Sequence, residues 1–353
     1  MSERLWQKNL IKIEPYTAGE QPKNNKIIKL NANENPYPPS PKVQEVLDNL
    51  KYGELKKYPL IDAAPLRKAI ADYYGIKQEN VFTGNGSDDV LATAFRAFFN
   101  SELPICYPDI TYSFYPVWCE LMKIPSKVLP VDENLKINIE DYYAPNGGVV
   151  LPNPNAPTSV GMGLESIVDL LEHNKDCIVI IDEAYVDFGG QSAVGLIDKY
   201  ENLVVTQTFS KSRSMAGMRV ACAMANPYLI SYMDAVKDSY NSYPMDSIAI
   251  QTGIASINDK DYFNETVAKI VNTRDNTASA MREMGFAVPE SQTNFLFVTH
   301  PKYNAKDIFE FLKSKDIFVR YFNKPRIDNY LRITIGTDSE MEMLVKALNE
   351  FIK

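Results

Sequence analysis

The stretch Thr208-Phe209-Ser210-Lys211-Ser212-Arg213-Ser214-Met215-Ala216-Gly217-Met218-Arg219 decides how the rest of this chain is interpreted. It follows the apolar, β-branched run Leu203–Thr206, which is typical of a buried strand. Lys211 therefore lies just beyond the end of a strand, where open α/β sheets bind their ligands. A lysine in such a place can form a Schiff base with an aldehyde. Taken alone, however, a lysine after a strand is usually a solvated loop residue.

Two hydroxyls and one arginine in the same stretch suit a phosphate group. They belong to Thr208, Ser210 and Arg219. Upstream, the segment Gly84-Asn85-Gly86-Ser87-Asp88 turns a short strand into an amphipathic helix. The free N–H groups at the start of a helix bind phosphate well. A glycine turn with an ordinary Ser or Asp cap explains this second motif equally well.

Composition narrows the function classes. The chain has 353 residues, enough for two domains, and its 45 acidic against 37 basic residues give a net charge of −8. This balance argues against nucleic acid or an anionic membrane as a partner. The apolar run Cys177–Ile181 is far too short to span a bilayer, and Met1–Arg4 does not resemble a signal peptide. We therefore expect a cytoplasmic protein.

Cysteine and histidine usage excludes several kinds of catalytic site. The four cysteines are scattered without a C-x-x-C motif, so we expect free thiols and no disulfide framework. The only two histidines, His173 and His300, are more simply explained as structural or solvated residues. We therefore expect no metal and no nucleophile activated by histidine.

Three further strands end next to side chains that suit a binding site. The first precedes Tyr112, whose ring could stack on a flat heterocycle, and the second leads into a proline-rich loop that places the Asn155 amide. The third, Cys177–Ile181, is the most apolar and ends at Asp182. A carboxylate at the end of a buried strand is costly unless it meets a cation or a strong donor. Asp182 therefore needs a partner.

The strands that end near Asn155, Asp182 and Lys211 are separated by helical stretches near residues 164–173 and 189–201. This alternation is typical of a mostly parallel sheet. Because the carboxyl ends of parallel strands share one edge, we expect these side chains and the glycine-rich turn to meet in one crevice.

The pattern changes after about residue 230, and we expect a second, smaller α+β domain. The proposed division is an N-terminal arm of residues 1–30, a large domain of residues 31–230 that extends to about 250 at most, and a small domain of residues 251–353. In the small domain we expect helices at 262–284, at 305–315 and from 339, and strands at 295–298, 317–320 and 330–335.

Jointly and in order, these motifs resemble the fold-type I pyridoxal-phosphate aminotransferases of the class II subgroup, and within it the histidinol-phosphate aminotransferases. The similarity covers essentially the whole chain. It implies an α/β fold in which helices flank a mostly parallel, seven-stranded-type sheet beside a smaller α+β domain, with pyridoxal 5'-phosphate as cofactor. The resemblance rests on the segments Asn31–Pro36, Lys57–Pro59, Gly86–Asp88, Pro154–Thr158, Asp182–Tyr185, Ser210–Lys211, Ala216–Arg219 and Leu331–Thr334.

The resemblance also implies roles for individual residues. Lys211 would bind the cofactor aldehyde and then shuttle the substrate proton. Asp182 would pair with the pyridinium nitrogen, Tyr185 and Asn155 would hold the phenolic oxygen, and Tyr112 would stack on the ring. The cofactor phosphate would be held by the backbone at Ser87 and Asp88, with Thr208, Ser210 and Arg219, and by Tyr58 of a partner subunit in a homodimer with shared active sites.

The substrate expectation rests on two arginines in or next to apolar strands, Arg320 and Arg332. Each needs an anion, which a structural salt bridge could also supply. With Tyr16 and Asn33 they resemble the substrate-phosphate pocket of the histidinol-phosphate enzymes. The resemblance thus implies amino transfer from L-histidinol phosphate to 2-oxoglutarate, giving imidazole acetol phosphate and glutamate in histidine biosynthesis.

Two departures from the family pattern are visible. Ala156 stands where many relatives have an asparagine directly before the proline, which weakens the donor role of Asn155, and the loop around Gly189-Gly190 is short. The alternatives within the fold are an aminotransferase for aromatic or other amino acids and a threonine-phosphate decarboxylase. The alternative from another class is a module that binds the cofactor without turnover.

Overall fold

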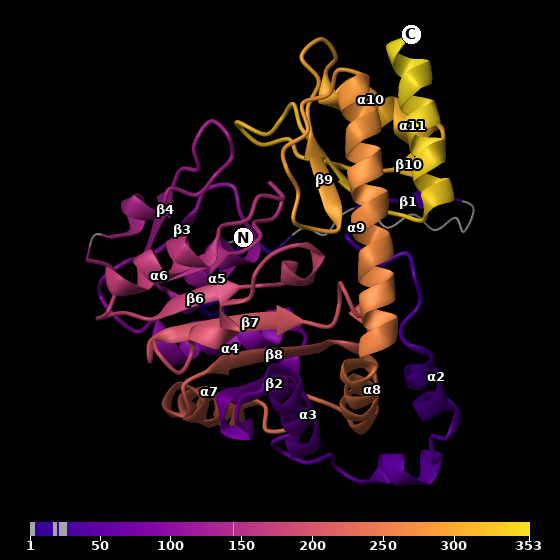
Figure 1. The fold of residues 1–353 in the computed structure, drawn as a ribbon. Helices are drawn as coiled ribbons and strands as arrows, with labels where there is room; N and C mark the ends of the chain where they lie inside the picture. The colour runs from indigo at the N-terminus through magenta and orange to yellow at the C-terminus, as the bar shows by residue number, and fades with distance from the viewer. Residues whose placement is uncertain (1–3, 17–19, 21–26, 144) are drawn as a thin grey trace.

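A seven-stranded sheet forms the centre of the computed structural model, which describes residues 4–16, 20, 27–143 and 145–353 (Figure 1). Its strand order is β2-β8-β7-β6-β5-β3-β4. Only β8 is antiparallel to its neighbours, so the expected mostly parallel sheet is confirmed. The strands are β2 Val81–Asn85, β3 Ile105–Pro108, β4 Ser126–Leu129, β5 Gly148–Pro152, β6 Val179–Asp182, β7 Leu203–Thr208 and β8 Val220–Ala225.

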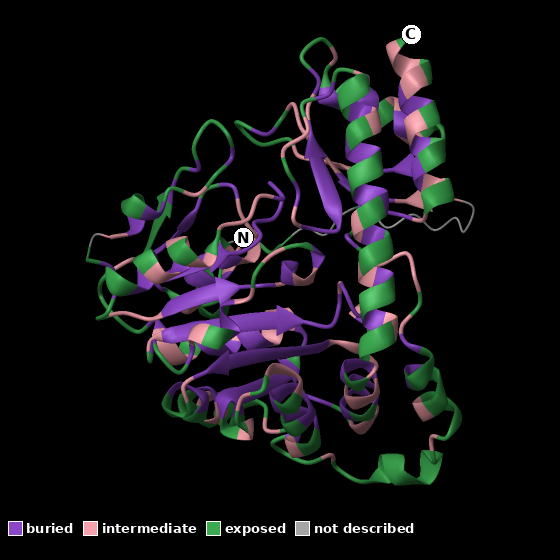
Figure 2. Cartoon of the chain, viewed as in Figure 1, coloured by how far each residue is buried: buried purple, intermediate pink, exposed green. Residues whose placement is uncertain are grey.

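Helices cover both faces of this sheet because successive strand residues point to opposite sides and both sets are apolar. On β6, Ile181 belongs to one apolar core and Ile180 to the other. Figure 2 shows the inner strands of the sheet buried along their length, whereas the outer surfaces of the helices and most of the edge strand β4 are exposed. The first core is covered by α3 Ala64–Tyr74, α6 Leu164–Glu172 and α8 Ser247–Asn258, and the second by α4 Ser87–Phe98, α5 Phe114–Met122 and α7 Pro227–Tyr240.

The C-terminal third has a sheet and an apolar core of its own. A three-stranded antiparallel sheet, in the order β11-β12-β9, packs against three helices (Figure 1). The end of the N-terminal arm joins this part because its strand β1 pairs with β10. The elements are β1 Ile28–Lys29, α9 Lys260–Glu283, β9 Phe295–Val298, α10 Ala305–Ser314, β10 Ile317–Phe318, β11 Arg320–Tyr321, β12 Leu331–Thr334 and α11 Asp338–Ile352, with α1 Leu5–Lys8 and α2 Pro41–Asp48 outside both sheets.

The structure corrects one expected helix and adds elements that the sequence pattern did not reveal. Residues 189–201 form no α-helix but contain the short 3-10 turn Ala193–Leu196. Gly189 takes a positive φ of 130°, which a helix cannot accommodate, and Glu183 binds the backbone N–H of Ala193. Strand β8 and helices α5, α7 and α8 were not predicted, and β8 lacks a strand signal because half of its residues are alanines.

Within the described residues, no helix combines the length and the apolar character needed to cross a membrane. The same part of the chain contains no group of three or more His, Cys, Asp or Glu side chains placed to bind a metal ion. The four cysteines, Cys106, Cys119, Cys177 and Cys222, are free thiols.

Candidate active site

The carboxyl ends of β2, β3, β5, β6 and β7 lie at one edge of the large sheet because these strands run in the same direction. Strand β8 runs the opposite way, so its first residue lies at that edge. Arg219 directly precedes β8 and therefore reaches the same edge as Lys211. The antiparallel strand thus explains how two residues eight positions apart come to one place.

Asp182, the last residue of β6, is buried and faces the aromatic side of the sheet. Its carboxylate accepts hydrogen bonds from the Tyr115 hydroxyl at 2.9 Å and the Thr206 hydroxyl at 3.3 Å. Burial raises the pKa of Asp182 to about 6, although both hydroxyls oppose the shift. Because these donors are neutral, the carboxylate can still accept a cationic N–H.

Tyr115 is the site residue that sequence reasoning missed. It is fully buried in α5, against Phe95 and Trp118. Its hydroxyl reaches Asp182 across the sheet surface, which orients the carboxylate. Only the requirement of Asp182 for a donor could have pointed to this tyrosine, since α5 itself was not predicted.

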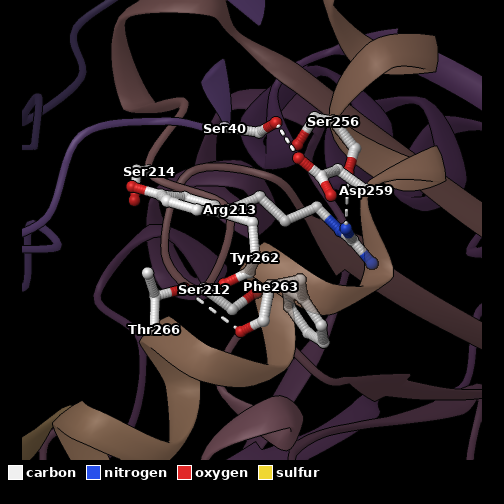
Figure 3. A pocket seen from close by; sticks show the side chains of 9 residues that line it. All are labelled: Ser40, Ser212, Arg213, Ser214, Ser256, Asp259, Tyr262, Phe263 and Thr266. Carbon is white, nitrogen blue, oxygen red and sulfur yellow. Dashed lines mark hydrogen bonds between the residues drawn. The ribbon is translucent and has the colours of Figure 1, made fainter. Parts of the chain in front are cut away.

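Arg213, two residues after Lys211, is held by residues of α8 and α9 (Figure 3). Arg213 is buried, donates to the carbonyl of Ser256 at 3.0 Å and lies 4.1 Å from the ring centroid of Phe263. From the other side the Asn35 amide donates to the carbonyl of Lys211 at 3.1 Å. The Lys211 ammonium lies 5.8 Å from the centroid of the Tyr185 ring. A fixed backbone therefore positions the lysine side chain next to Tyr185.

The glycine-rich turn and Arg219 form a cradle for an anion. Helix α4 begins at Ser87, and a Cβ on Gly86 would lie 2.3 Å from the Arg219 guanidinium, so only glycine fits there. Arg219 contacts the Asp88 carboxylate at 3.1 Å. The hydroxyls of Thr208 and Ser210 bond to each other at 2.9 Å on the adjoining strand end. The five residues expected to hold a phosphate thus lie at the same edge of the sheet, at the start of α4, at the end of β7 and just before β8.

Hydrogen bonds within the protein hold Tyr112 and Asn155, the two residues expected beside a flat heterocycle. The Tyr112 hydroxyl donates to Asp88 at 2.6 Å, and burial raises its pKa well above the usual range. The Asn155 amide nitrogen donates to the carbonyl of Ile110 at 2.9 Å and to Thr158 at 3.0 Å. Among the described residues, its buried oxygen has no partner. The Asn155 nitrogen is therefore already engaged within the protein.

Asn33 reaches the site from the loop after β1. Its amide nitrogen donates to the Tyr185 hydroxyl at 2.9 Å, and Thr334 of β12 contacts its other side. Asn33 is therefore placed between the small sheet and Tyr185.

Arg320 and Arg332 are direct partners across the β11–β12 pair. Arg332 donates to the carbonyl of Asn31 at 3.0 Å, and its Nε has no partner among the described residues. Burial lowers the pKa of Arg332, and the nearby Arg320 cation lowers it further. In the described part of the chain neither arginine forms an ion pair with a carboxylate, so the pair can accept an anion.

The last two candidate residues differ in where they lie. Tyr16 stacks on Phe114 with 4.4 Å between ring centroids and is close enough to Arg332 to affect its pKa. Tyr58 is 83% exposed, and its ring stacks on Tyr243 at 4.8 Å. The structure therefore brings Tyr16 to the arginine pair and leaves Tyr58 on the surface.

Comparisons with known proteins agree with this geometry. A family model described as aminotransferase class I and II matches residues 25–348. Relatives named histidinol-phosphate aminotransferase, from Lactococcus lactis subsp. cremoris (strain MG1363) and Acinetobacter baumannii (strain SDF), are 48% and 50% identical, each over 99% of this chain and 98% of the relative.

Two solved structures are also similar. One is described as a putative histidinol-phosphate aminotransferase from Erwinia carotovora atroseptica SCRI1043, with a TM-score of 0.85 and 25% identity over 95% of this chain and 98% of that one. The other is histidinol-phosphate aminotransferase from Sinorhizobium meliloti in complex with pyridoxal-5'-phosphate, with a TM-score of 0.82 and 25% identity over 93% and 91%.

Proposed function

The chain belongs to the class I and II aminotransferase family, and on that premise we propose that it transfers the amino group of L-histidinol phosphate to 2-oxoglutarate. The products are imidazole acetol phosphate and glutamate, and the reaction belongs to histidine biosynthesis. The observation that carries the substrate assignment is the pair Arg320 and Arg332, which face each other across two strands and have no carboxylate partner among the described residues. Relatives named for this activity match the chain over almost its whole length.

Pyridoxal 5'-phosphate is the cofactor, and the residues at the sheet edge fit it. Asp182 is a buried carboxylate with only neutral donors, which suits a ring N–H cation. Because Gly86 has no Cβ, the Arg219 guanidinium can lie against the turn that begins α4, where a cation and the free backbone N–H groups suit a phosphate. When bound, the cofactor supplies an electron sink for the bonds at the substrate's α-carbon.

The residues of this chain have distinct tasks in that chemistry. Lys211 would hold the cofactor through its Nζ and, once released, would move the proton from the substrate's α-carbon to the cofactor carbon that had carried the aldehyde. Asp182 keeps a proton on the ring nitrogen, because an anion in a low-dielectric site favours the cation it contacts. Tyr185 donates its hydroxyl to the phenolic oxygen. We propose Asn155 as a second donor to that oxygen, which requires its amide nitrogen to exchange one of its present bonds, to Ile110 or to Thr158, for the new contact.

Other residues bind and orient. Tyr112 would pack on the ring, while the backbone of Ser87 and Asp88 and the side chains of Thr208, Ser210 and Arg219 would hold the cofactor phosphate. Arg320 and Arg332 hold the phosphate of histidinol phosphate in one half-reaction and a carboxylate of glutamate in the other, since guanidinium groups bind both anions through paired N–H donors. Tyr16 and Asn33 complete the proposed substrate pocket. The stacked rings of Tyr16 and Phe114 offer a flat apolar wall, which favours aromatic amino acids as the second candidate substrates.

We also propose a homodimer in which Tyr58 contacts the cofactor phosphate of the partner subunit. The supporting observation is that Tyr58 is exposed in one chain, in a segment with further exposed apolar residues such as Leu55 and Leu60. The division into an arm of residues 1–30, a large domain of 31–230 and a small domain of 251–353 remains a proposal, supported by the two separate sheets. Free cysteines support a cytoplasmic location, where thiols stay reduced.

The substrate proposal is tested by comparing kcat/KM for histidinol phosphate, histidinol and phenylalanine. Arg320→Ala should lower kcat/KM for histidinol phosphate by roughly ten- to a hundredfold, because a charged hydrogen bond to the phosphate is lost. The kcat/KM for histidinol, which lacks the phosphate, should fall far less in this variant. Arg282→Ala, which removes an exposed arginine of α9, is the control and should leave the preference unchanged. If loss of either the substrate phosphate or Arg320 does not alter the preference, the aromatic aminotransferase assignment replaces this one.

The shared site is tested by mixing two inactive parents, Lys211→Ala and Tyr58→Ala. A mixed dimer then contains one site with an intact Lys211 and an intact Tyr58 from the other subunit. Activity should reappear in the mixture and increase with the fraction of mixed dimers. No gain over the parents would show that Tyr58 acts within its own chain.

A further inference from the structure

Hydrogen bonds to Thr334 and Tyr185 fix the orientation of the Asn33 side-chain amide. Its backbone N–H donates to the Thr334 hydroxyl oxygen at 3.0 Å, and that hydroxyl lies 3.2 Å from the Asn33 amide oxygen. Since the hydroxyl already accepts one bond, its hydrogen donates to the amide oxygen. The amide nitrogen must then face Tyr185, 2.9 Å from its hydroxyl oxygen. All of these bonds are buried.

This orientation determines what the Tyr185 hydroxyl can do. Its oxygen accepts the N–H of Asn33, so its single hydrogen must point elsewhere. The ring is held edge-on against Phe295 at 5.1 Å, and the Lys211 ammonium lies over its face. The direction left for the hydroxyl hydrogen is therefore toward the side of the ring on which Lys211 lies.

We propose that Asn33 is a positioning residue that directs the Tyr185 hydroxyl hydrogen toward the phenolic oxygen of the cofactor. Thr334 in turn fixes the Asn33 amide, two residues beyond Arg332 in strand β12. The strand that carries a substrate arginine is thereby linked to the cofactor contact. This inference rests on the proposed cofactor and on the Tyr185 contact to it, and it assigns Asn33 a role beyond the substrate pocket.

The loop itself does not need the Asn33 side chain. Asn33 has a positive φ of 55°, and its backbone oxygen accepts the Asn294 amide at 3.0 Å. Glycine adopts such a φ at least as readily and keeps both backbone bonds. Asn33→Gly therefore removes the amide and leaves the loop its conformation.

A hydroxyl that accepts a hydrogen bond becomes a stronger donor, because hydrogen bonds in a chain polarise one another. A stronger bond to the phenolic oxygen favours the form in which that oxygen is negative and the cofactor–lysine linkage has lost its proton. The pH midpoint of the cofactor's absorbance change should therefore be lower with Asn33 than without it. For Asn33→Gly we expect a rise of roughly half a pH unit, the size that follows from losing part of one hydrogen bond.

The experiment is a spectrophotometric pH titration of the cofactor-loaded protein without substrate, so that turnover plays no part. Asn33→Gly and Tyr185→Phe should both raise the midpoint, Tyr185→Phe by more. Thr334→Val, which removes the hydroxyl at nearly constant volume, should raise it by less than Asn33→Gly. Thr334→Ser keeps the hydroxyl and is the control that should leave the midpoint where it is.

The double variant Asn33→Gly with Tyr185→Phe separates positioning from general stability. If Asn33 acts through the hydroxyl, the double variant titrates like Tyr185→Phe alone. A full further shift in that background would overturn the proposal, as would a lower melting temperature of Asn33→Gly with an unchanged midpoint. If Tyr185→Phe itself leaves the midpoint unchanged, Tyr185 does not contact the cofactor and the proposal fails. A wild-type protein that does not bind pyridoxal 5'-phosphate would instead refute the proposed function.

Discussion

Asp182 and Glu183 are neighbours in the chain, both fully enclosed, and yet they belong to two different regions of the molecule. Asp182 ends β6 on the face covered by α4 and α5, whereas Glu183 points to the opposite face. Burial raises the pKa of Asp182 to about 6 and that of Glu183 to about 7. By burial and pKa alone the two carboxylates are therefore alike.

Their surroundings distinguish them. Glu183 accepts the Ser192 hydroxyl at 2.6 Å, the Ala193 N–H at 2.6 Å and the Gln207 amide at 2.8 Å, and Gln207 is bound in turn by Tyr74. Asp182 accepts two hydroxyls and the Ala184 backbone N–H, and it lies on the sheet face and at the strand edge that carry the other candidate site residues. Each carboxylate thus has three neutral protein donors, and the two differ in which face of the sheet they occupy and in which side chains share that face.

The largest expected difference between the two residues is in turnover. Asp182→Asn should lower kcat by about a thousandfold or more, because the ring nitrogen loses its anion. Glu183→Gln should retain kcat within about tenfold, since Glu183 points to the opposite face of the sheet and is bound by Ser192, Ala193 and Gln207. Steady-state rates per folded molecule, with circular dichroism as the control for folding, measure both. Equal losses of kcat in the two variants would contradict the assignment of a catalytic role to Asp182 alone.

The next difference concerns how the stability of the cofactor-free protein depends on pH. The folded pKa of Asp182, about 6, lies above its usual value of 3.8, so the folded state binds more protons than the unfolded state in this range. The free energy of unfolding therefore falls as pH rises from about 4 to 6, by up to about 3 kcal/mol from this residue. Urea unfolding at several pH values should show that Asp182→Asn loses less stability than wild type over this interval. Identical slopes would contradict the raised pKa.

The smallest expected effect is on the stability of Glu183→Gln. Its amide would place an N–H₂ group among three donors, leaving at least one of them without an acceptor at a cost of about 1–3 kcal/mol. Asp182→Asn should not show this loss in the cofactor-free protein at neutral pH. Chemical denaturation of both variants at pH 7 makes the comparison. If Glu183→Gln is as stable as wild type, the hydrogen bonds of Glu183 to Ser192, Ala193 and Gln207 do not stabilise the fold.

The sequence predicted the site best where chemistry follows a strand directly. Asp182 and Lys211 could be placed because each stands after a buried apolar run, and such strands end at a common edge. Tyr115 could not be placed, because its hydroxyl reaches Asp182 only through the packing of α5 on the sheet. Contacts between distant segments leave no periodic trace in the chain.

Long-range contacts also explain the other differences. The direction of β8 depends on pairing with both β2 and β7, and no local pattern of alanines encodes it. Asn33 was expected to meet substrate, yet its orientation is set by Thr334, 301 residues away, and by Tyr185. The expected helix at 189–201 failed because Glu183 binds the turn that replaces it.

The proposed half-reaction with histidinol phosphate depends on Lys211 and Asp182 at the common edge of the large sheet. It is tested most directly by mixing the cofactor-loaded protein with histidinol phosphate in the absence of an oxo acid and recording the absorbance. The aldehyde form of the cofactor should convert stoichiometrically to the amine form, 2-oxoglutarate should restore it, and histidinol should act far more weakly. An unchanged spectrum, or an equal response to histidinol, would contradict the proposed half-reaction with histidinol phosphate.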